Sequence, residues 1–440
     1  AHDEFAIGER YTDAFDVLSA DGTMTSVTIH IDGTNDKPSI EGLSSSNETL
    51  ESRGTTRAPV LLEGFFFDAD LSDQHTVTVD WGIKPGISDS ETFPATELAL
   101  SQTGSFLRKH TYANGGIYTI TVTVDDGHGG IDTLTTTAVI TGVGLVDGTL
   151  YIIGTQGRDH VDLKFNEKKD ELKVDVKLNQ GGGHGGSDGG SDGGQDKIRG
   201  TFTAASVDRV VAYLLDGDDQ YNGGSDGGSD GGSDAAISQF IFGGGGNDKI
   251  QGGRGNDVLD GGDGDDDVNG GNGNDTLLGG NGEDKLDGGK GNDYLNGGRG
   301  DDDLKGGDGD DILVGGDGDD KLKSGKGRSI LIGGSGSDKL TGGKDDNLLI
   351  GNRVTFEDDE EALKLVLAEW SSDNSLSARV NNLKGTGSST RFNSNVYLNS
   401  ATVLDDGATD TLMGSSGQDW FLGTLGQDIF KDKKRDDLIN

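Results

Sequence analysis

Apolar and polar residues alternate along the first third of the chain. Residues 14–31, AFDVLSADGTMTSVTIHI, alternate on both sides of a DGT turn, which predicts a β-hairpin. The same alternation recurs in HTVTVDWG at 75–82 and in HTYANGGIYTITVTVDDGHGG at 110–130, and it is the period of strands with one buried face. These stretches predict a block of short strands across residues 45–143.

A nine-residue period begins at Gly243. From there to Ile350 the unit GGxGxDxUx, in which U is a large apolar residue, occurs in twelve consecutive slots without an insertion. One apolar residue per unit makes a core only if units stack on one another. The residues at this eighth position are Ile250, Leu259, Val268, Leu277, Leu286, Leu295, Leu304, Leu313, Leu322, Leu331, Leu340 and Leu349.

The sixth position of the unit is an aspartate in most slots. These residues are Asp248, Asp257, Asp266, Asp275, Asp284, Asp293, Asp302, Asp311, Asp320 and Asp338. Looser units at 154–162, 216–224 and 405–431 carry Asp159, Asp219, Asp410, Asp419 and Asp428. The repeat therefore predicts a stack of short strands with rows of carboxylates along it.

The repeat is interrupted after residue 350. In EDDEEALKLVLAEW at 357–370, apolar residues have the spacing of an amphipathic helix after an acidic start. They are Leu363, Val366, Leu367 and Trp370. We expect a second helix at Ser375–Leu383, and we expect the pair to cover the open end of the stack rather than to form a docking surface.

Composition and charge limit the partners. The chain has 440 residues, 78 acidic and 37 basic side chains, a net charge of −41 and no cysteine. The acidic excess argues against nucleic acids and anionic membranes, and without cysteine there are no disulfides or thiolate metal sites. No apolar run is long enough to span a membrane. The seven histidines lack zinc-binding spacing and no nucleophile or phosphate-binding motif occurs, so we do not expect an enzyme.

The sixth-position aspartates need a cation. Stacked strands lie about 4.8 Å apart, so carboxylates in register repel by roughly 3.5 kcal/mol per neighbouring pair at an effective dielectric constant of 20. Burial of one leucine contributes only about 1.5 to 3 kcal/mol. We therefore expect the repeats to fold only when a cation binds. Oxygen ligands without imidazole or thiol favour calcium over zinc or copper.

The repeat resembles the RTX family, whose units form a parallel β-roll with two units per turn. The resemblance implies that alternate units stack and that about eight or more calcium ions lie between turns, held by the sixth-position aspartates and by carbonyls of the glycine-rich loops. Beyond the ten aspartates of the regular units, the implied ligands are Asp159, Asp219, Asp419, Asp428, Gly244, Gly246, Gly253, Gly255, Gly262, Gly264, Gly271, Gly273, Gly280 and Gly282.

Two units depart from the pattern, and both are even-numbered when units are counted from Gly243. Unit ten has Ser329 and unit twelve has Asn347 at the sixth position. We expect the even edge to lose its calcium row after about unit eight, while the odd edge continues to unit eleven. Lys326 and Arg328 could then replace the missing ion electrostatically.

Other resemblances concern the rest of the chain. Residues 1–40, which end in DGTNDKP, resemble the last strands of a bacterial cadherin-like or VCBS repeat. Residues 41–143 resemble a PKD-type immunoglobulin-like sandwich, with WGIKPG where that family usually has WGDG. From about 150 to 440 the chain resembles the C-terminal region of large calcium-binding surface proteins of planctomycete-like bacteria, including the helical interruption and the return to repeats.

The cadherin resemblance implies a further calcium site at a domain junction. Asp32, Asn35 and Asp36 resemble the cadherin linker, and Asp68 and Asp70 in FFFDADLSD could supply the partner loop. A turn stabilised by the same Asn and Asp residues is the alternative.

The predicted fold class is all-β: an immunoglobulin-like sandwich followed by a parallel β-roll with a short helical interruption near the C-terminus. After the partial repeat at 1–40 and the sandwich at 41–143, the predicted segments are coils with Gly/Ser/Asp loops at 144–242, the calcium-binding roll at 243–350, the helical insertion or cap at 351–404 and terminal coils at 405–440. We expect the Gly/Ser/Asp tracts at 181–196 and 223–234 to be mobile loops rather than extra calcium sites.

Together these patterns and resemblances predict a calcium-dependent structural or adhesive module of a secreted bacterial surface protein. The alternative is a non-catalytic secretion and folding module of an extracellular enzyme exported by a type I system. Expected partners are calcium and other cell-surface proteins or polysaccharide, with no nucleic acid and no membrane span. Since residues 1–40 supply too few strands for a sandwich, they either fray, pack loosely or complete the sheet of another subunit in head-to-tail assembly.

Overall fold

The computed structural model divides the chain into two compact units, Ala1–Asp147 and Gly148–Asn440. It describes residues 10–18, 24–32, 36–45, 59–69, 74–82, 90–97, 103–166, 169–179, 195–224, 237–387, 390–424, 426–432 and 438–439. Most of both Gly/Ser/Asp tracts, together with Asn35 and Asp70, lies outside these residues.

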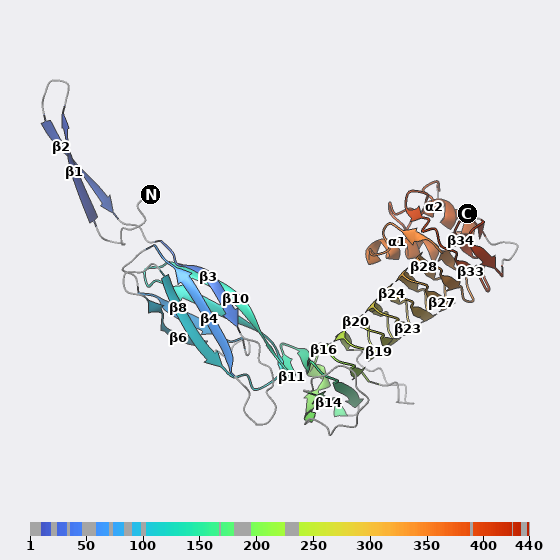
Figure 1. Cartoon of the computed structure of the whole chain (residues 1–440), viewed down its shortest axis with the longest axis horizontal. Helices are drawn as coiled ribbons and strands as arrows, with labels where there is room; N and C mark the ends of the chain where they lie inside the picture. The colour runs from blue at the N-terminus through green and yellow to red at the C-terminus, as the bar shows by residue number, and fades with distance from the viewer. Residues whose placement is uncertain are drawn as a thin grey trace. The chain divides into compact units, whose positions relative to one another are not determined.

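The first unit contains a hairpin and a two-sheet sandwich (Figure 1). The hairpin predicted at 14–31 is confirmed, since β1 (Arg10–Leu18) pairs antiparallel with β2 (Met24–Asp32). One sheet of the sandwich has the order β3 (Ser39–Ser45), β4 (Val60–Phe67), β8 (Thr103–His110) and β7 (Thr96–Glu97). The other has the order β10 (Ile131–Ile140), β9 (Gly116–Asp125), β5 (Thr76–Asp80) and β6 (Ser90–Pro94). The strand β11 (Gly142–Val146) comes after β10 along the chain and is not part of this sheet.

The core of the sandwich follows the two-residue alternation of its strands. Every second residue of β4 and β9 is buried, including Val60, Leu62 and Ile120. The hydroxyl of Tyr112 donates a hydrogen bond of 2.9 Å to the backbone oxygen of Trp81, which satisfies the polar end of a buried aromatic side chain. The alternation predicted for this block is therefore confirmed.

The second unit is a parallel β-roll made of two long sheets. Sheet A has the order β12 (Thr149–Thr155), β16 (Arg209–Asp216), β18 (Ser238–Gly245), β20 (Val258–Asp263), β22 (Thr276–Asn281), β24 (Tyr294–Arg299), β26 (Ile312–Asp317), β28 (Ile330–Ser335), β30 (Leu348–Ile350), β34 (Trp420–Leu422) and β36 (Leu438–Ile439). Sheet B has the order β15 (Gln195–Thr203), β14 (Glu171–Asn179), β13 (His160–Asn166), β17 (Gln220–Asn222), β19 (Lys249–Arg254), β21 (Asp267–Asn272), β23 (Lys285–Lys290), β25 (Asp303–Asp308), β27 (Lys321–Lys326), β29 (Lys339–Thr341), β33 (Thr411–Met413) and β35 (Ile429–Lys431).

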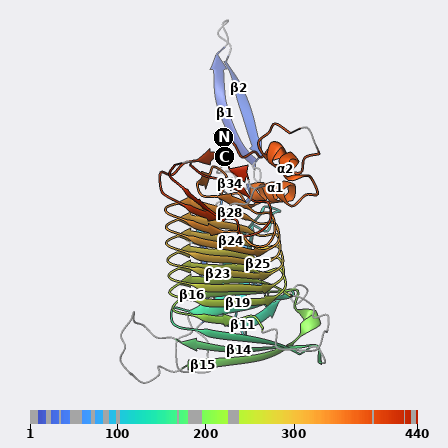
Figure 2. The ribbon, with the colours of Figure 1, turned by 90° about the vertical axis from the view of Figure 1, so that its right-hand side faces the viewer.

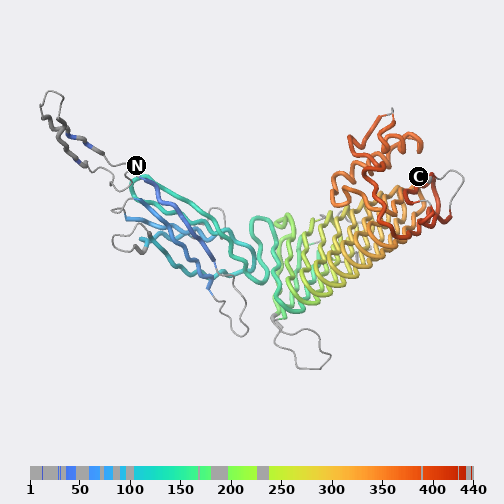
Figure 3. Tube along the Cα trace, turned by 45° about the horizontal axis from the view of Figure 1, so that its top comes forward, coloured from blue at the N-terminus to red at the C-terminus, as the bar shows by residue number. Residues whose placement is uncertain are grey.

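Each turn of the roll contains two nine-residue units, so that residues 18 apart stack. In sheet A, Leu259 is the partner of Leu277, and in sheet B, Val268 is the partner of Leu286. The eighth-position residues are all buried between the sheets. Figures 2 and 3 show the resulting stack of regular coils. The predicted stacking of alternate units is confirmed.

The first coils differ from the predicted plain coils. After β13 the chain turns back through β14 and β15, which extend sheet B in the antiparallel sense. The short 3₁₀ helix Ala204–Ser206 then leads into β16. Because β14 alternates buried and half-buried residues with the period of two, its sequence makes a half-buried antiparallel strand instead of another short coil.

The helical insertion leaves the roll through a short antiparallel pair, β31 (Arg353–Val354) and β32 (Val403–Leu404). It contains α1 (Glu360–Trp370) and α2 (Leu376–Leu383). The side chains of Asp359 and Ser375 accept hydrogen bonds from the N–H groups of Ala362 and Ala378, as N-caps do. Both predicted helices are present, and no helix in the described part of the chain is long and apolar enough to cross a membrane.

The position of the insertion corrects the expectation of an end cap. The helices pack against the outer face of sheet A near its last strands, on the side of β24 and β28 in Figure 1, and β33 and β34 continue both sheets beyond the insertion. The physical reason is that the outer face of sheet A becomes apolar here. The residues of this face in the shared core are Tyr294, Ile312, Val314, Ile330, Ile332, Leu348, Ile350, Trp420 and Leu422.

We predict that Trp370→Ala releases the insertion from sheet A. Trp370 is fully buried, its indole N–H donates to the backbone oxygen of Asp346, and its ring lies 6.2 Å from that of Trp420. Truncation of such a residue costs about 3–5 kcal/mol, so limited proteolysis should cleave within 357–404 first. The control is Phe392→Ala, since Phe392 is 48% exposed. Equal protease resistance of both variants would contradict this packing role.

Candidate metal centre

Two rows of buried aspartates run along the roll, one beside each sheet. The backbone N–H of most sixth-position residues donates to Oδ1 of the sixth-position residue in the next coil. In the row of odd units the Asp248-to-Asp266 bond is 2.7 Å, and in the row of even units the Asp257-to-Asp275 bond is 2.8 Å. This repeating contact holds every carboxylate in register with the next.

The second oxygen of these carboxylates has no hydrogen-bond partner. Oδ2 is buried and unpartnered in Asp219, Asp248, Asp257, Asp266, Asp275, Asp284, Asp293, Asp302, Asp311, Asp320, Asp338 and Asp410. A buried polar atom without a partner costs free energy, and a whole row of such atoms is unusual in a folded protein. Oxygens of this kind are the ligands expected of a bound cation.

Burial and mutual repulsion raise the pKa values of the rows. Loss of solvation, with added repulsion from neighbouring aspartates, raises the pKa of Asp302, Asp311 and Asp338 to about 8. The same loss of solvation raises the pKa of Asp248 and Asp284 to about 6, with repulsion from Asp218 and Asp265 added. Without a cation, a negative charge on these carboxylates therefore costs free energy. This cost grows as the pH rises through these pKa values.

Glycines bring the backbone close to these oxygens. A Cβ atom on Gly261, the first position of unit three, would lie 2.2 Å from Oδ2 of Asp266. Gly262, the second position, has a φ of +107°, and its Cβ would lie 2.1 Å from the carbonyl oxygen of Gly244. Only glycine fits such close and left-handed positions. The ten glycines implied as ligands by the resemblance all have positive φ.

The donor set fits calcium bound by mixed ligands. Across the described residues, no group of three or more histidine or acidic side chains is arranged to hold a metal ion. A cation here would therefore be held by the sixth-position carboxylates of successive coils together with backbone carbonyls. Hard oxygen donors in a flexible arrangement are what calcium prefers.

The two ends of the odd row differ from its middle. Asp159 accepts hydrogen bonds from the backbone of Thr155 and Asn179, through both of its oxygens. Asp428 accepts from the backbone of Asp410 and Thr424, again through both oxygens. Both oxygens of these two carboxylates thus have hydrogen-bond partners within the protein. Asp159 and Asp428 therefore end the row and differ from its inner members, whose Oδ2 has no such partner.

The hydrogen bonds of the even row continue through units ten and twelve, which have no carboxylate at the sixth position. The N–H of Asp311 donates to the hydroxyl of Ser329, the N–H of Ser329 donates to Oδ1 of Asn347, and the N–H of Asn347 donates to Oδ1 of Asp419. Serine and asparagine thus keep the hydrogen-bonded register while removing charge from this stretch. Loss of calcium from the even edge after about unit eight stays a prediction.

The side chains of Lys326 and Arg328 contact groups outside the row of sixth-position residues. The ammonium group of Lys326 pairs with Asp308 on the surface. The guanidinium of Arg328 donates to the backbone oxygens of Ser371 and Ser372, at the C-terminal end of α1. A cation is favoured at that end of a helix, so the expected substitution for calcium is corrected: Arg328 fastens the insertion instead.

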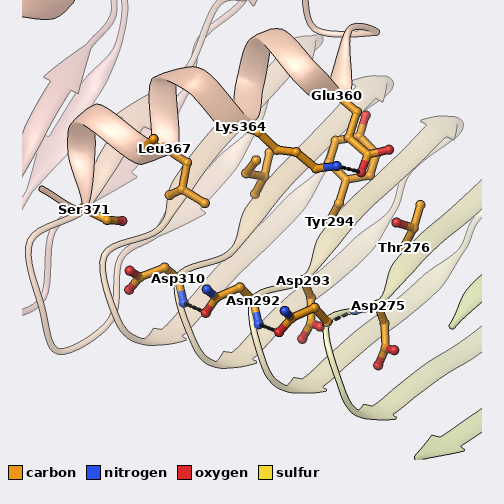
Figure 4. A pocket seen from close by; sticks show the side chains of 13 residues that line it. Asp275, Thr276, Asn292, Asp293, Tyr294, Asp310, Glu360, Lys364, Leu367 and Ser371 are labelled. Carbon is orange, nitrogen blue, oxygen red and sulfur yellow. Dashed lines mark hydrogen bonds and ion pairs between the residues drawn. The ribbon is translucent and has the colours of Figure 1, made fainter. Parts of the chain in front are cut away.

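A second ladder at the fifth position was not predicted. The backbone N–H of Asn292 donates to Oδ1 of Asn274, and the N–H of Asp310 donates to Oδ1 of Asn292, as Figure 4 shows. On the other edge, Asp265 accepts in the same way from Glu283. The signal was present in the sequence, because the fifth position is Asn, Asp or Glu in units one to nine.

The candidate site at the domain junction is only partly described. Asn35 and Asp70 lie outside the described residues, and Asp32 is the last residue of β2. Oδ2 of Asp68 lies 2.9 Å from Nε2 of His75, and both side chains are buried. Calcium binding by Asp32, Asp36 and Asp68 stays a prediction.

Without calcium, we predict that the roll is less stable at alkaline than at mildly acidic pH. The aspartates have their ordinary pKa near 3.8 when unfolded and values of about 6 to 8 when folded, so the folded state binds more protons. Stability is then greatest at low pH and is lost as the pH rises toward about 8. Thermal unfolding in EDTA at about pH 5.5 and about pH 8.5, followed by circular dichroism, tests this sign. A calcium-free roll more stable at the higher pH would refute it.

We predict that Asp302→Asn has opposite effects with and without calcium. Asparagine keeps Oδ1, which accepts from Asp284, but removes one charge from the row. In EDTA at about pH 8.5 the variant should keep more β-signal than the unmodified chain because repulsion falls, whereas in calcium it should lose about 1–3 kcal/mol and bind about one ion fewer. Isothermal titration calorimetry and melting curves measure both.

The matched control for this substitution is Asp301→Asn. Asp301 is exposed, its Oδ1 accepts from the N–H of Asp319, and the change removes the same charge. The control should leave calcium binding nearly unchanged. If the two variants behaved alike, the sixth position would have no special role.

The repeats match a known family model. The model of the RTX calcium-binding nonapeptide repeat (4 copies) matches residues 242–277, 269–304, 278–313, 296–331, 325–353 and 405–430. No curated protein matches the chain. The matched segments contain the regular units and the coils that resume after the insertion. The roll described here thus carries RTX repeats, a kind of repeat that binds calcium.

Proposed function

We propose that this chain is a calcium-dependent structural or adhesive module of a secreted bacterial surface protein. The observation that carries the proposal is the row of buried carboxylate oxygens without hydrogen-bond partners, in units that match RTX repeats. Such repeats are typical of secreted extracellular proteins. In this proposal the module is a component of an adhesin, filament or surface layer.

The mechanism follows from what the chain's own residues do. The sixth-position aspartates each keep one buried oxygen, Oδ2, without a hydrogen-bond partner, and Oδ1 keeps the coils in register through backbone N–H groups. Calcium, when bound, would supply the positive charge that lets these carboxylates stack. Where calcium is scarce the row repels itself and the repeats unfold, and where calcium is abundant they fold.

The first unit supports the structural form of this proposal. A sandwich with its own core precedes the roll, and arrays of such sandwiches are common in surface proteins. We propose that the PKD-like and cadherin-like resemblances reflect such an array, similar to planctomycete surface proteins. Assembly through the β1–β2 hairpin, which would complete the sheet of a second subunit, belongs to the same proposal.

The alternative is a folding and secretion module of an extracellular enzyme. RTX repeats suit this role equally well, because a calcium-triggered roll folds only after export. We propose in either case that residues 1–440 are themselves non-catalytic. The sandwich unit favours the structural role over the alternative.

We predict that EDTA unfolds the roll of the full chain while the sandwich stays folded. In EDTA at neutral pH the carboxylate rows lose their counter-charge, so circular dichroism should lose β-signal and proteases should cleave within 243–440. Fragments covering 59–147 should persist, because the core of this unit is apolar. Millimolar calcium should restore resistance, and magnesium should not, since it demands a smaller and more rigid site. A roll that resists proteases equally in EDTA would overturn the proposed switch.

A further inference from the structure

The outer face of sheet B is charged, and along most of its length the charges alternate. In the row of seventh-position residues, the ammonium group of Lys249 lies 2.7 Å from a carboxylate oxygen of Asp267. Asp267 is the partner of Lys285 on the next strand, and Lys285 is the partner of Asp303. Opposite charges directly across a sheet stabilise it, so this half of the face neutralises itself.

The alternation ends at strands β25, β27 and β29. Lys321 is the direct partner of Lys339, and in the ninth-position row Lys305 is the direct partner of Lys323. All four side chains are exposed. Among the described residues, none of the four forms an ion pair. We call these four residues the lysine patch.

The lysine patch is unfavourable for the isolated protein. Strands in a sheet lie about 4.8 Å apart, and like charges directly opposite each other destabilise a sheet. Acidic residues outnumber basic residues by 78 to 37 in this chain. Lysines opposite lysines are therefore not what the overall composition predicts for these positions. The patch has Asp303 beside Lys321 and Asp287 beside Lys305, which leaves a net positive strip of two parallel rows.

The surroundings of the patch restrict what can bind. Asp301 and Asp319 are exposed in the loops before β25 and β27, Asp308 is the last residue of β25, and Asp310 lies in the loop that follows. The positive strip is thus narrow and lies between acidic edges. A broad polyanion such as a nucleic acid duplex would meet these edges, whereas a slender single chain with repeating negative charges would lie along the strip.

We propose that the lysine patch binds a linear acidic polysaccharide through its carboxylate groups. The patch presents one pair of ammonium groups in each row, and a chain with several carboxylates can contact more than one of these groups at once, so that several contacts add up where one would be weak. This inference rests on the proposed role at a bacterial surface, and it places the ligand on sheet B, away from the insertion on sheet A.

The test is binding of a fluorescent hyaluronan oligosaccharide to the full chain in calcium, measured by anisotropy over a range of salt concentrations. Hyaluronan is linear and carries a carboxylate on every second sugar. The variant K305Q/K323Q/K339Q should bind about tenfold more weakly or worse, and the slope of log affinity against log salt should fall by about three, as for other polyanions. The control K249Q/K285Q/K290Q removes three lysines from strands β19 and β23 of the same sheet and should bind like the unmodified chain.

Several outcomes would overturn the proposal. They are equal binding by the two triple variants, no binding by the unmodified chain at low salt, and tighter binding of a short DNA duplex than of hyaluronan. Neutral dextran should not bind. Circular dichroism of the unmodified chain and of both variants in calcium separates this inference from the proposed function. If the unmodified chain fails to fold with calcium, the proposed function is wrong. If both variants fold and bind hyaluronan equally, only the role of the lysine patch is wrong.

Discussion

Repulsion between carboxylates buried in register is the constraint on which the roll depends. Each coil places an aspartate about one strand spacing from the next, with one oxygen hydrogen-bonded to backbone and the other unpartnered, as in Asp284 and Asp302. A single eighth-position side chain per unit, such as Leu304, cannot offset that repulsion. The apolar ladder and the carboxylate rows therefore form one system, whose stability depends on an external cation.

Other features of the repeat keep the rows in place. Glycines such as Gly261 and Gly262 allow backbone to lie where any side chain would collide with a carboxylate or a carbonyl. The fifth-position ladder joins successive loops through backbone N–H groups, which donate to a neutral side chain at Asn274 and to a carboxylate at Asp265. Ser329 and Asn347 preserve the same register at lower charge. Register and charge thus account for the polar side chains at the fifth and sixth positions of the unit.

The two outer faces of the roll have different roles. Sheet A becomes apolar toward its end and is covered by α1 and α2, which the buried Arg379 holds through Asp346 and the backbone of Trp370. The groove beside α1, about 440 Å³, is lined by the fifth-position ladder and by Tyr294 and Lys364 (Figure 4). Sheet B stays charged, and its outer face is exposed at Lys285, Lys321 and Lys339 among the residues that the structure describes. This asymmetry leaves sheet B as the face available to a partner.

The sequence by itself determined the roll. Each repeat unit contacts only its neighbours, so the length of the repeat specifies which residues stack on one another. The nine-residue spacing located the buried eighth position and the sixth-position aspartates, and the two-residue alternation located the strands of the sandwich. Tertiary structure alone decided which face the insertion covers, that Arg328 binds the end of α1 at Ser371, and that β33 continues sheet B next to β29. These contacts join residues 43 to 72 positions apart, and no local period specifies which distant surfaces meet.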